Sequence, residues 1–170
     1  MSNNKKNNIE VEVRALVKNL DETAKNIIKS NGKYLGYYSI HDIYFCKKEI
    51  DDLIKVEMKE VGSYGLRVRK LINDQKTEIT INTKVIIKED DHNAWREHEV
   101  VVENFEDIFH ILENTEFKAF FELKKVRHHY KLNDFDIFLE DISNFSSGIE
   151  IEKMANINNK EKVKRKYLHL

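Results

Sequence analysis

Charged and aliphatic residues alternate along several segments of this chain, which is the pattern of β-strands with one polar face. From residue 9 to residue 16 the alternation is regular. Glu10, Glu12 and Arg14 therefore share one face, because side chains two residues apart lie on the same side of a strand. Similar patterns predict further strands at residues 35–46, 65–71, 78–87, 95–103, 120–132, 135–142 and 148–152, the last of them short.

Two other segments carry apolar residues at helical spacing. The first follows Asn19 and Asp21, either of which can cap a helix, and Gly32 is placed to end it. The second begins at Asn104. Weaker signals predict a helical tendency at residues 51–58, a polar turn at 90–93 and a basic, helical tail from residue 158.

Length, charge and cysteine content bound the class of protein. The chain has 170 residues and no evident internal linker, so the elements predict one strand-dominated α+β domain over residues 1–170. Charged residues make up 35% of the chain but nearly cancel, and a formal net charge of -1 gives no basic field for nucleic acid or membrane. The single cysteine, Cys46, is typical of a reducing compartment, and no apolar run is long enough to span a bilayer. We therefore expect a cytoplasmic protein that binds neither nucleic acid nor membrane.

Arginine, lysine and glutamate recur at alternate positions in nearly every predicted strand. One such pair is what any solvated strand face shows, so a single pair favours no function. Together they differ from ordinary solvated faces, which also contain serine, threonine and glutamine. If the strands curl into a barrel, these side chains line a shared interior, where buried charges need each other, water, a metal or a ligand. Beyond the first strand, the positions are Arg67, Arg69, Asn82, Lys84, Glu97, Glu99, Lys125, Arg127, Glu140, Glu150 and Glu152.

Such an interior suits particular ligands. Carboxylates suit a divalent cation, and guanidinium and ammonium groups suit a polyphosphate. The chain has no glycine-rich loop ending in Lys-Ser/Thr, which argues against a P-loop nucleotide site. Its seven histidines show no convincing zinc spacing.

A series of short motifs follows this face along the chain. They are Glu10-x-Glu12, Asp42-Ile43-Tyr44-Phe45, Leu66-Arg67-Val68-Arg69, Lys84, Arg96-Glu97-His98-Glu99, Lys125-Val126-Arg127-His128-His129-Tyr130, Leu139-Glu140-Asp141-Ile142 and Gly148-Ile149-Glu150-Ile151-Glu152. Each motif is weak alone, but their order and spacing resemble the triphosphate tunnel metalloenzymes, also called CYTH proteins, over nearly the full length. The chain is most similar to the class IV adenylyl cyclase-like branch.

The resemblance implies a closed, eight-stranded antiparallel β-barrel that forms a triphosphate tunnel, with a few flanking helices. It implies Mg²⁺ or Mn²⁺ as the cofactor, held by Glu10, Glu12, Glu150 and Glu152. Glu97 and Glu99 would lie on the tunnel wall, as metal ligands or as counter-charges. The triphosphate oxygens would be bound by Arg67, Arg69, Lys84, Lys125 and Arg127. The catalytic positions would be Glu10, Glu12, Arg14 and Glu140.

Two positions depart from the family's usual pattern. Arg14 stands where lysine is common, and Glu140 stands where aspartate is usual. Arginine stays protonated, so Arg14 can stabilise negative charge but cannot accept a proton.

The implied function is metal-dependent chemistry on a small-molecule triphosphate. In the cyclase-like branch ATP becomes cyclic AMP and pyrophosphate. A hydrolase of inorganic tripolyphosphate, nucleoside triphosphate or thiamine triphosphate uses the same cage, and a non-catalytic polyphosphate or nucleotide binder is a third alternative. Homodimers are common in the cyclase-like branch, and the sequence does not decide the oligomeric state of this protein.

Overall fold

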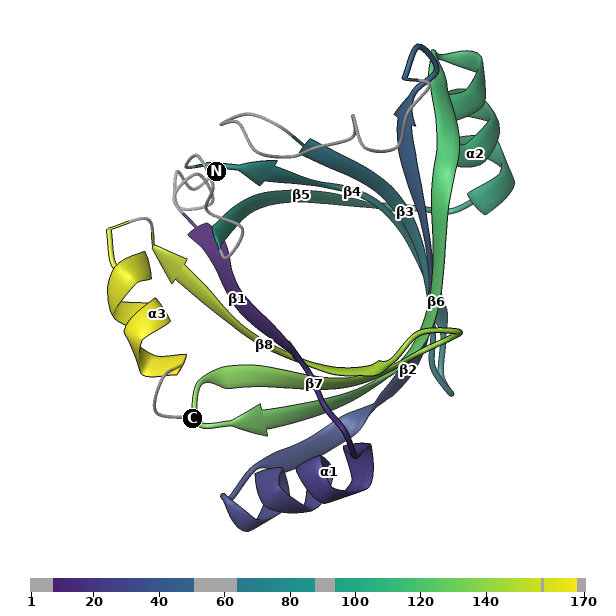
Figure 1. The fold of residues 1–170 in the computed structure, drawn as a ribbon. Helices are drawn as coiled ribbons and strands as arrows, with labels where there is room; N and C mark the ends of the chain where they lie inside the picture. The colour runs from purple at the N-terminus through teal and green to yellow at the C-terminus, as the bar shows by residue number, and fades with distance from the viewer. Residues whose placement is uncertain (1–7, 51–63, 88–93, 157, 168–170) are drawn as a thin grey trace.

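The structure is a computed structural model that describes residues 8–50, 64–87, 94–156 and 158–167. The strands in these ranges close into one antiparallel barrel, in the order β1-β5-β4-β3-β2-β6-β7-β8 (Figure 1). The bounds are β1 Asn8–Leu16, β2 Lys33–Lys47, β3 Tyr64–Ile72, β4 Thr77–Ile86, β5 Ala94–Val102, β6 Phe117–Leu132, β7 Phe135–Ile142 and β8 Ser147–Asn156. The described residues thus confirm the predicted closed, eight-stranded α+β barrel.

The helices lie outside the ring of strands (Figure 1). They are α1 Leu20–Lys29, α2 Phe105–Asn114 and α3 Lys160–Tyr167. Within the described ranges, none of them has the length and apolar content that crossing a membrane requires.

The apolar face of the barrel wall points outward, beneath the helices. Each helix shares a buried apolar cluster with the strands that it covers, and burial of one such side chain contributes roughly 1.5–3 kcal/mol. The clusters contain Ile27 and Leu139 under α1, Leu112 and Val68 under α2, and Val163 and Val11 under α3. Because strand residues alternate between faces, this arrangement turns the neighbouring charged residues into the barrel.

The first helix begins where the sequence predicts, but the residue that ends it in a left-handed conformation precedes the expected one. The Asn19 side chain caps it by accepting a hydrogen bond from the backbone N–H of Glu22 at 3.1 Å. Asn31, not Gly32, takes the left-handed conformation, with a φ of 67°. Gly32 is needed for close approach instead, since a Cβ there would lie 2.4 Å from Cγ2 of Ile27.

The final strand was expected to be short, and that prediction was wrong. β8 runs from Ser147 to Asn156 because it pairs with the whole length of β1. β2 and β6 also begin earlier than predicted, at Lys33 and Phe117. The helical tendency predicted at residues 51–58 and the turn predicted at 90–93 lie outside the described residues.

Candidate active site within the barrel

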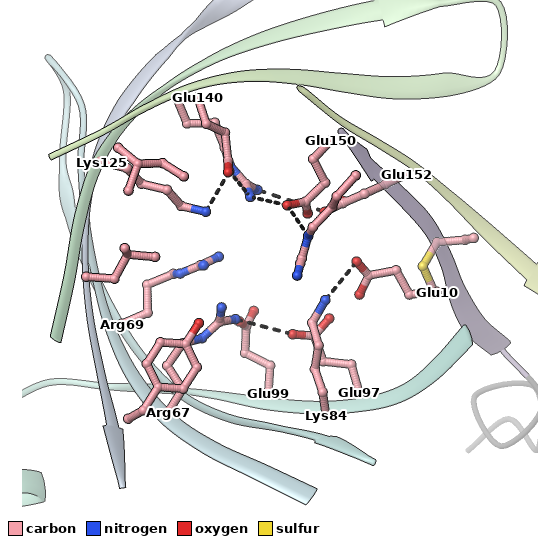
Figure 2. Close-up of a pocket in the computed structure, with 16 residues that line it drawn as sticks. Glu10, Arg67, Arg69, Lys84, Glu97, Glu99, Lys125, Glu140, Glu150 and Glu152 are labelled. Carbon is pink, nitrogen blue, oxygen red and sulfur yellow. Dashed lines mark hydrogen bonds and ion pairs between the residues drawn. The ribbon is translucent and has the colours of Figure 1, made fainter. Parts of the chain in front are cut away.

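A cavity of about 350 Å³ lies inside the barrel, and charged side chains of both signs line it (Figure 2). Carboxylates and cationic groups are equally numerous on its wall. The lining residues are Glu10, Arg14, Tyr44, Arg67, Arg69, Lys84, Glu97, Glu99, Leu123, Lys125, Arg127, Glu140, Ile142, Glu150, Glu152 and Met154. Of the residues predicted to face the interior, Glu12 and Asn82 are not part of this lining, and both border an adjoining cavity of about 100 Å³.

Four predicted carboxylates come together where β1 and β8 pair. The register sets Glu12 opposite Glu152, and Glu10 and Glu150 follow on the same face. One oxygen from each of the four lies within 4.8 Å of the others. Four converging carboxylate oxygens are the donor set that Mg²⁺ and Mn²⁺ favour, so these residues fit a divalent cation.

The crowding of these acids shifts their pKa values in opposite directions. Burial, with the neighbouring Glu150 carboxylate, raises the pKa of Glu152 to about 10. Burial also works to raise the pKa of Glu150, but the Arg127 guanidinium holds it well below its usual value. Burial raises the pKa of Glu10 and of Glu12, although the nearby Lys84 opposes both shifts. Burying these four carboxylates together is therefore unfavourable unless nearby cations neutralise their charge.

Two side chains from the neighbouring strands hold the acids of β1. The Lys84 ammonium group donates to Oε1 of Glu10 at 3.1 Å and to Oε2 of Glu12 at 2.9 Å. The Trp95 indole N–H donates to Oε1 of Glu12 at 3.0 Å. The sequence suggested no partner for Trp95, and only the pairing of β1 with β5 brings it to the site.

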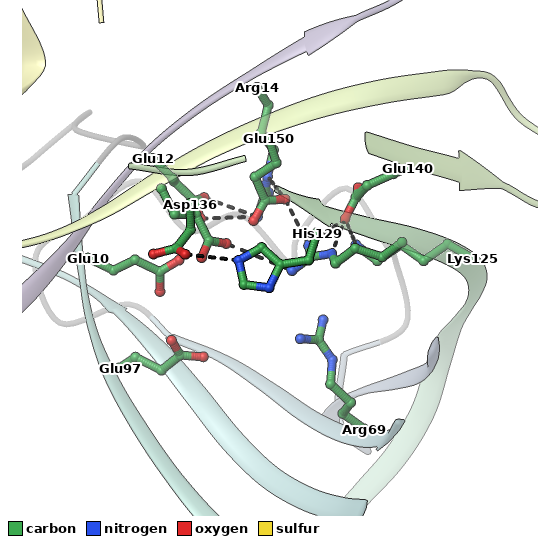
Figure 3. Close-up of polar contacts among 12 residues, drawn as sticks. Glu10, Glu12, Arg14, Arg69, Glu97, Lys125, His129, Asp136, Glu140 and Glu150 are labelled. Carbon is green, nitrogen blue, oxygen red and sulfur yellow. Dashed lines mark hydrogen bonds and ion pairs between the residues drawn. The ribbon is translucent and has the colours of Figure 1, made fainter. Parts of the chain in front are cut away.

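Two guanidinium groups meet at the Glu150 carboxylate. Nε of Arg14 donates to Oε2 of Glu150 at 2.8 Å, and its Nη2 donates to Glu12 at 3.2 Å (Figure 3). Nη2 of Arg127 donates to the same Glu150 oxygen at 3.1 Å. Arg127 also stacks on the ring of Phe138, with 4.4 Å between Cζ and the ring centroid.

On the opposite wall, Asp42 organises two of the predicted phosphate-binding arginines. Nε and Nη2 of Arg69 donate to its two oxygens at 2.7 and 2.8 Å, and Nη1 of Arg67 lies 3.5 Å away. Asp42 is fully buried. Its burial works to raise its pKa, but Arg69 and Arg67 hold the pKa below its usual value. Asp42 was not among the predicted site residues. Its position opposite Arg69 in the pairing of β2 with β3 identifies it as one.

Lys125 and Glu140 form a second buried pair. The Lys125 ammonium group donates to Oε1 of Glu140 at 2.6 Å, and Nε of Arg127 donates to the same oxygen at 2.6 Å. Burial and the neighbouring Arg127 lower the pKa of Lys125 to about 8, although Glu140 opposes them. Lys125 therefore loses its charge at a lower pH than an ordinary lysine does.

The two remaining predicted acids, Glu97 and Glu99, line the cavity but lie outside the group of four converging carboxylates. Glu99 accepts hydrogen bonds from Asn82 at 3.1 Å and from Thr80 at 3.3 Å. Glu97 lies 3.6 Å from Nη2 of Arg67. The contact of Glu97 with Arg67 favours the counter-charge role for Glu97, whereas the partners of Glu99 are neutral.

The pair formed by His129 of β6 and Asp136 of β7 was not predicted from the sequence. Nε2 of His129 lies 2.9 Å from Oδ1 of Asp136 (Figure 3), and its ring stacks on Phe138 with centroids 4.5 Å apart. His129 and the guanidinium of Arg127 therefore both stack on the Phe138 ring. This stack restricts where Arg127 can point.

Most of the charged groups described above are paired with an opposite charge, and Glu99 is held by neutral donors instead. A cation bound by the four glutamates would take over the role that Lys84, Arg14 and Arg127 now play. Those cationic groups would then be available to an anionic ligand, and guanidinium and ammonium groups suit phosphate oxygens. The cavity can therefore exchange its internal ion pairs for a metal and a polyphosphate.

The family model for the CYTH domain matches residues 8–170. Among curated proteins, one from Methanocaldococcus jannaschii that is named as a candidate adenylate cyclase is 25% identical over 156 residues. This match covers 91% of the present chain and 83% of that protein.

Solved structures share the fold. A protein from Pyrococcus horikoshii matches with a TM-score of 0.79 at 21% identity, covering 94% of this chain and 86% of that one. A Hippeastrum protein, described as a candidate adenylyl cyclase with a dominant triphosphatase activity, matches with a TM-score of 0.60 at 16% identity, covering 95% of this chain and 85% of that one. With a family model that spans nearly the whole barrel, this chain belongs to the CYTH domain family, as its motifs predicted.

Proposed function

We propose that this protein is a divalent-metal-dependent enzyme that converts ATP to cyclic AMP and pyrophosphate, like the class IV adenylyl cyclases. One observation carries the proposal. Four carboxylates that fit Mg²⁺ or Mn²⁺ converge inside the barrel, and three of them line the same cavity as the cationic groups that suit a triphosphate. The name of the Methanocaldococcus relative supports the same reaction.

The cationic side chains would hold the triphosphate in an extended position. Arg67 and Arg69 approach from β3, while Lys125 and Arg127 approach from β6 on an adjoining part of the wall. Asp42 and Glu140 keep these groups oriented before the ligand arrives. Because the clamp is preorganised, little orientational entropy is lost when the reaction begins.

The bound metal would supply charge neutralisation at the phosphate oxygens. In the cyclase reaction the 3′-hydroxyl oxygen attacks the α-phosphorus, and the bond from that phosphorus to the leaving pyrophosphate breaks. Arg14 stays protonated, since Glu150 and Glu12 raise its pKa further against the opposing effect of burial. It would stabilise the developing negative charge, and a wall carboxylate such as Glu140 would accept the hydroxyl proton.

Hydrolysis of a triphosphate is the second candidate. The charged groups described above suit phosphate and a metal, and none of them requires a nucleoside. The structural neighbour from Hippeastrum, which is described by its triphosphatase activity, also favours this candidate. Water would then replace the 3′-hydroxyl as the nucleophile.

Product analysis tests the proposal. The purified protein is incubated with Mg²⁺ or Mn²⁺ and either ATP or tripolyphosphate, and cyclic AMP, pyrophosphate and phosphate are measured separately. Cyclic AMP with an equal amount of pyrophosphate is expected from ATP. Phosphate release alone would replace the cyclase by a hydrolase, and binding of both ligands without any product would make the protein a binding module.

A further inference from the structure

A second cavity, of about 320 Å³, adjoins the charged one and differs from it in character. The two share Arg14, Glu140 and Ile142 in their walls. The remaining lining of the second cavity, here called the mouth pocket, is apolar or without a side chain. It consists of Ala15, Leu16, Phe145, Gly148 and Ile149.

The strand register places the mouth pocket at the end of the charged interior. Leu16 continues the inward alternation of β1 just beyond Arg14, and it pairs with Gly148 of β8. Gly148 also pairs with Glu140 of β7. A ligand that extends from the charged cavity past Arg14 would therefore enter the mouth pocket.

Apolar side chains are exposed at this pocket to an unusual degree. Phe145 and Leu16 are the most exposed large hydrophobic residues in the part of the chain that the structure describes, at 75% and 70%. The backbone of Phe145 is held in the turn between β7 and β8, where its N–H donates to the Ile142 carbonyl at 3.1 Å. Fixed and exposed apolar surface beside a binding cavity is typical of a site that a ligand covers.

We propose that the mouth pocket binds the organic end of an organic triphosphate, a nucleobase or similar planar ring, while the phosphates occupy the charged cavity. This inference rests on the proposed function and specifies its substrate class. Phe145 offers a ring for stacking, and Leu16, on the same face of β1 as Arg14, offers aliphatic contacts. Arg14 lies in the wall between the two parts of the ligand.

The chemistry of the pocket also sets its selectivity. Arg14 and Glu140 are its only charged lining residues, and both are engaged in ion pairs with the charged cavity. Stacking tolerates any base, because every base has a flat aromatic face. The pocket therefore separates organic from inorganic triphosphates more strongly than it separates one base from another.

Two variants test the pocket without touching the charged groups. Phe145→Ala removes the stacking face of an exposed residue. Gly148→Val fills the pocket, and the added Cβ meets only the Ala15 carbonyl oxygen, at an ordinary 3.5 Å. Ile111→Ala is the matched control, because Ile111 is an exposed apolar residue of α2, outside the barrel.

Affinities are measured by calorimetry with Mg²⁺ for an ATP analogue whose phosphate bridges are methylene groups, and for the corresponding inorganic triphosphate. We expect Phe145→Ala and Gly148→Val each to weaken the nucleotide analogue by about fivefold or more, the scale of one lost base stack. Binding of the inorganic analogue should stay unchanged, and Ile111→Ala should alter neither affinity.

The two ligands separate failure of this inference from failure of the proposed function. If both variants bind the nucleotide analogue as the original protein does, or lose both ligands equally, the mouth pocket does not hold the organic group. If the original protein binds neither analogue, the proposed function fails and the inference fails with it.

Discussion

Arg127 of β6 donates a hydrogen bond of 3.1 Å to Glu150 of β8, although β7 separates the two strands in the barrel wall. The contact spans the inner face of β7, and it joins a residue predicted to bind phosphate to a residue predicted to bind the metal. Each partner is at least nine-tenths buried. A ligand that binds to one of these two residues therefore changes the charge balance around the other.

Replacing the Glu152 carboxyl by an amide should weaken metal binding without unfolding the protein. Because the pKa of Glu152 is raised to about 10, its carboxyl is neutral near pH 7 without metal, and glutamine replaces one neutral group by another of the same shape, so Glu152→Gln should keep the free energy of unfolding within about 1 kcal/mol. Its affinity for Mn²⁺, measured by calorimetry, should fall about tenfold or more because the amide cannot supply the carboxylate that Glu152 would offer to the cation. Glu161→Gln, on an exposed position of α3, is the control. Unchanged Mn²⁺ affinity in Glu152→Gln would remove this residue from the metal site.

Arg69 should contribute to both stability and phosphate affinity, and a second substitution separates the two. Arg69→Ala leaves the fully buried Asp42 without its bidentate partner, so we expect a loss of about 3–5 kcal/mol in unfolding free energy. Adding Asp42→Asn should recover part of that stability in chemical denaturation. Tripolyphosphate affinity should stay low in the double variant, because the guanidinium is still missing. Recovery of full tripolyphosphate affinity would show that Arg69 acts only on the fold. Arg96→Ala, at an exposed position of β5, serves as the control.

Triphosphate affinity should decrease with rising pH through the titration of Lys125. Its pKa is lowered to about 8, so above that pH the ammonium group loses its charge and its attraction for phosphate. A bound triphosphate favours the charged form, so binding takes up a proton near this pH. Lys125→Arg stays charged, and the ratio of its affinity to that of the original protein should therefore rise from about pH 7 to about pH 9. Using the ratio cancels the titration of the ligand, and a flat ratio would contradict the role given to Lys125.

The tryptophan should report metal binding directly. Trp95 is the only tryptophan in the chain, it is buried, and its indole N–H donates to Glu12 at 3.0 Å. A paramagnetic Mn²⁺ ion bound by the glutamates should quench its fluorescence in a saturable titration, whereas Glu12→Gln should shift that titration to higher metal concentration. Fluorescence that does not respond while calorimetry records Mn²⁺ binding would place the ion elsewhere.

The sequence alone determined which side chains face the interior. Strict alternation in a strand leaves each residue only two directions, so Glu10, Glu12, Lys125 and Arg127 could be assigned to one face from spacing. The motif order then indicated the family, and with it the closed barrel. The shared orientation of these residues follows from local geometry, which is why it was predictable.

Register and packing decided which of these residues meet. Asp42 gained its role because β2 pairs with β3, and Trp95 gained its partner because β1 pairs with β5. The mouth pocket exists only because Leu16 lies beside Gly148 and the turn residue Phe145, both of which are distant from it in sequence. Contacts of this kind depend on how strands align across the sheet, and a one-residue slip would exchange the faces, so no local pattern contains them.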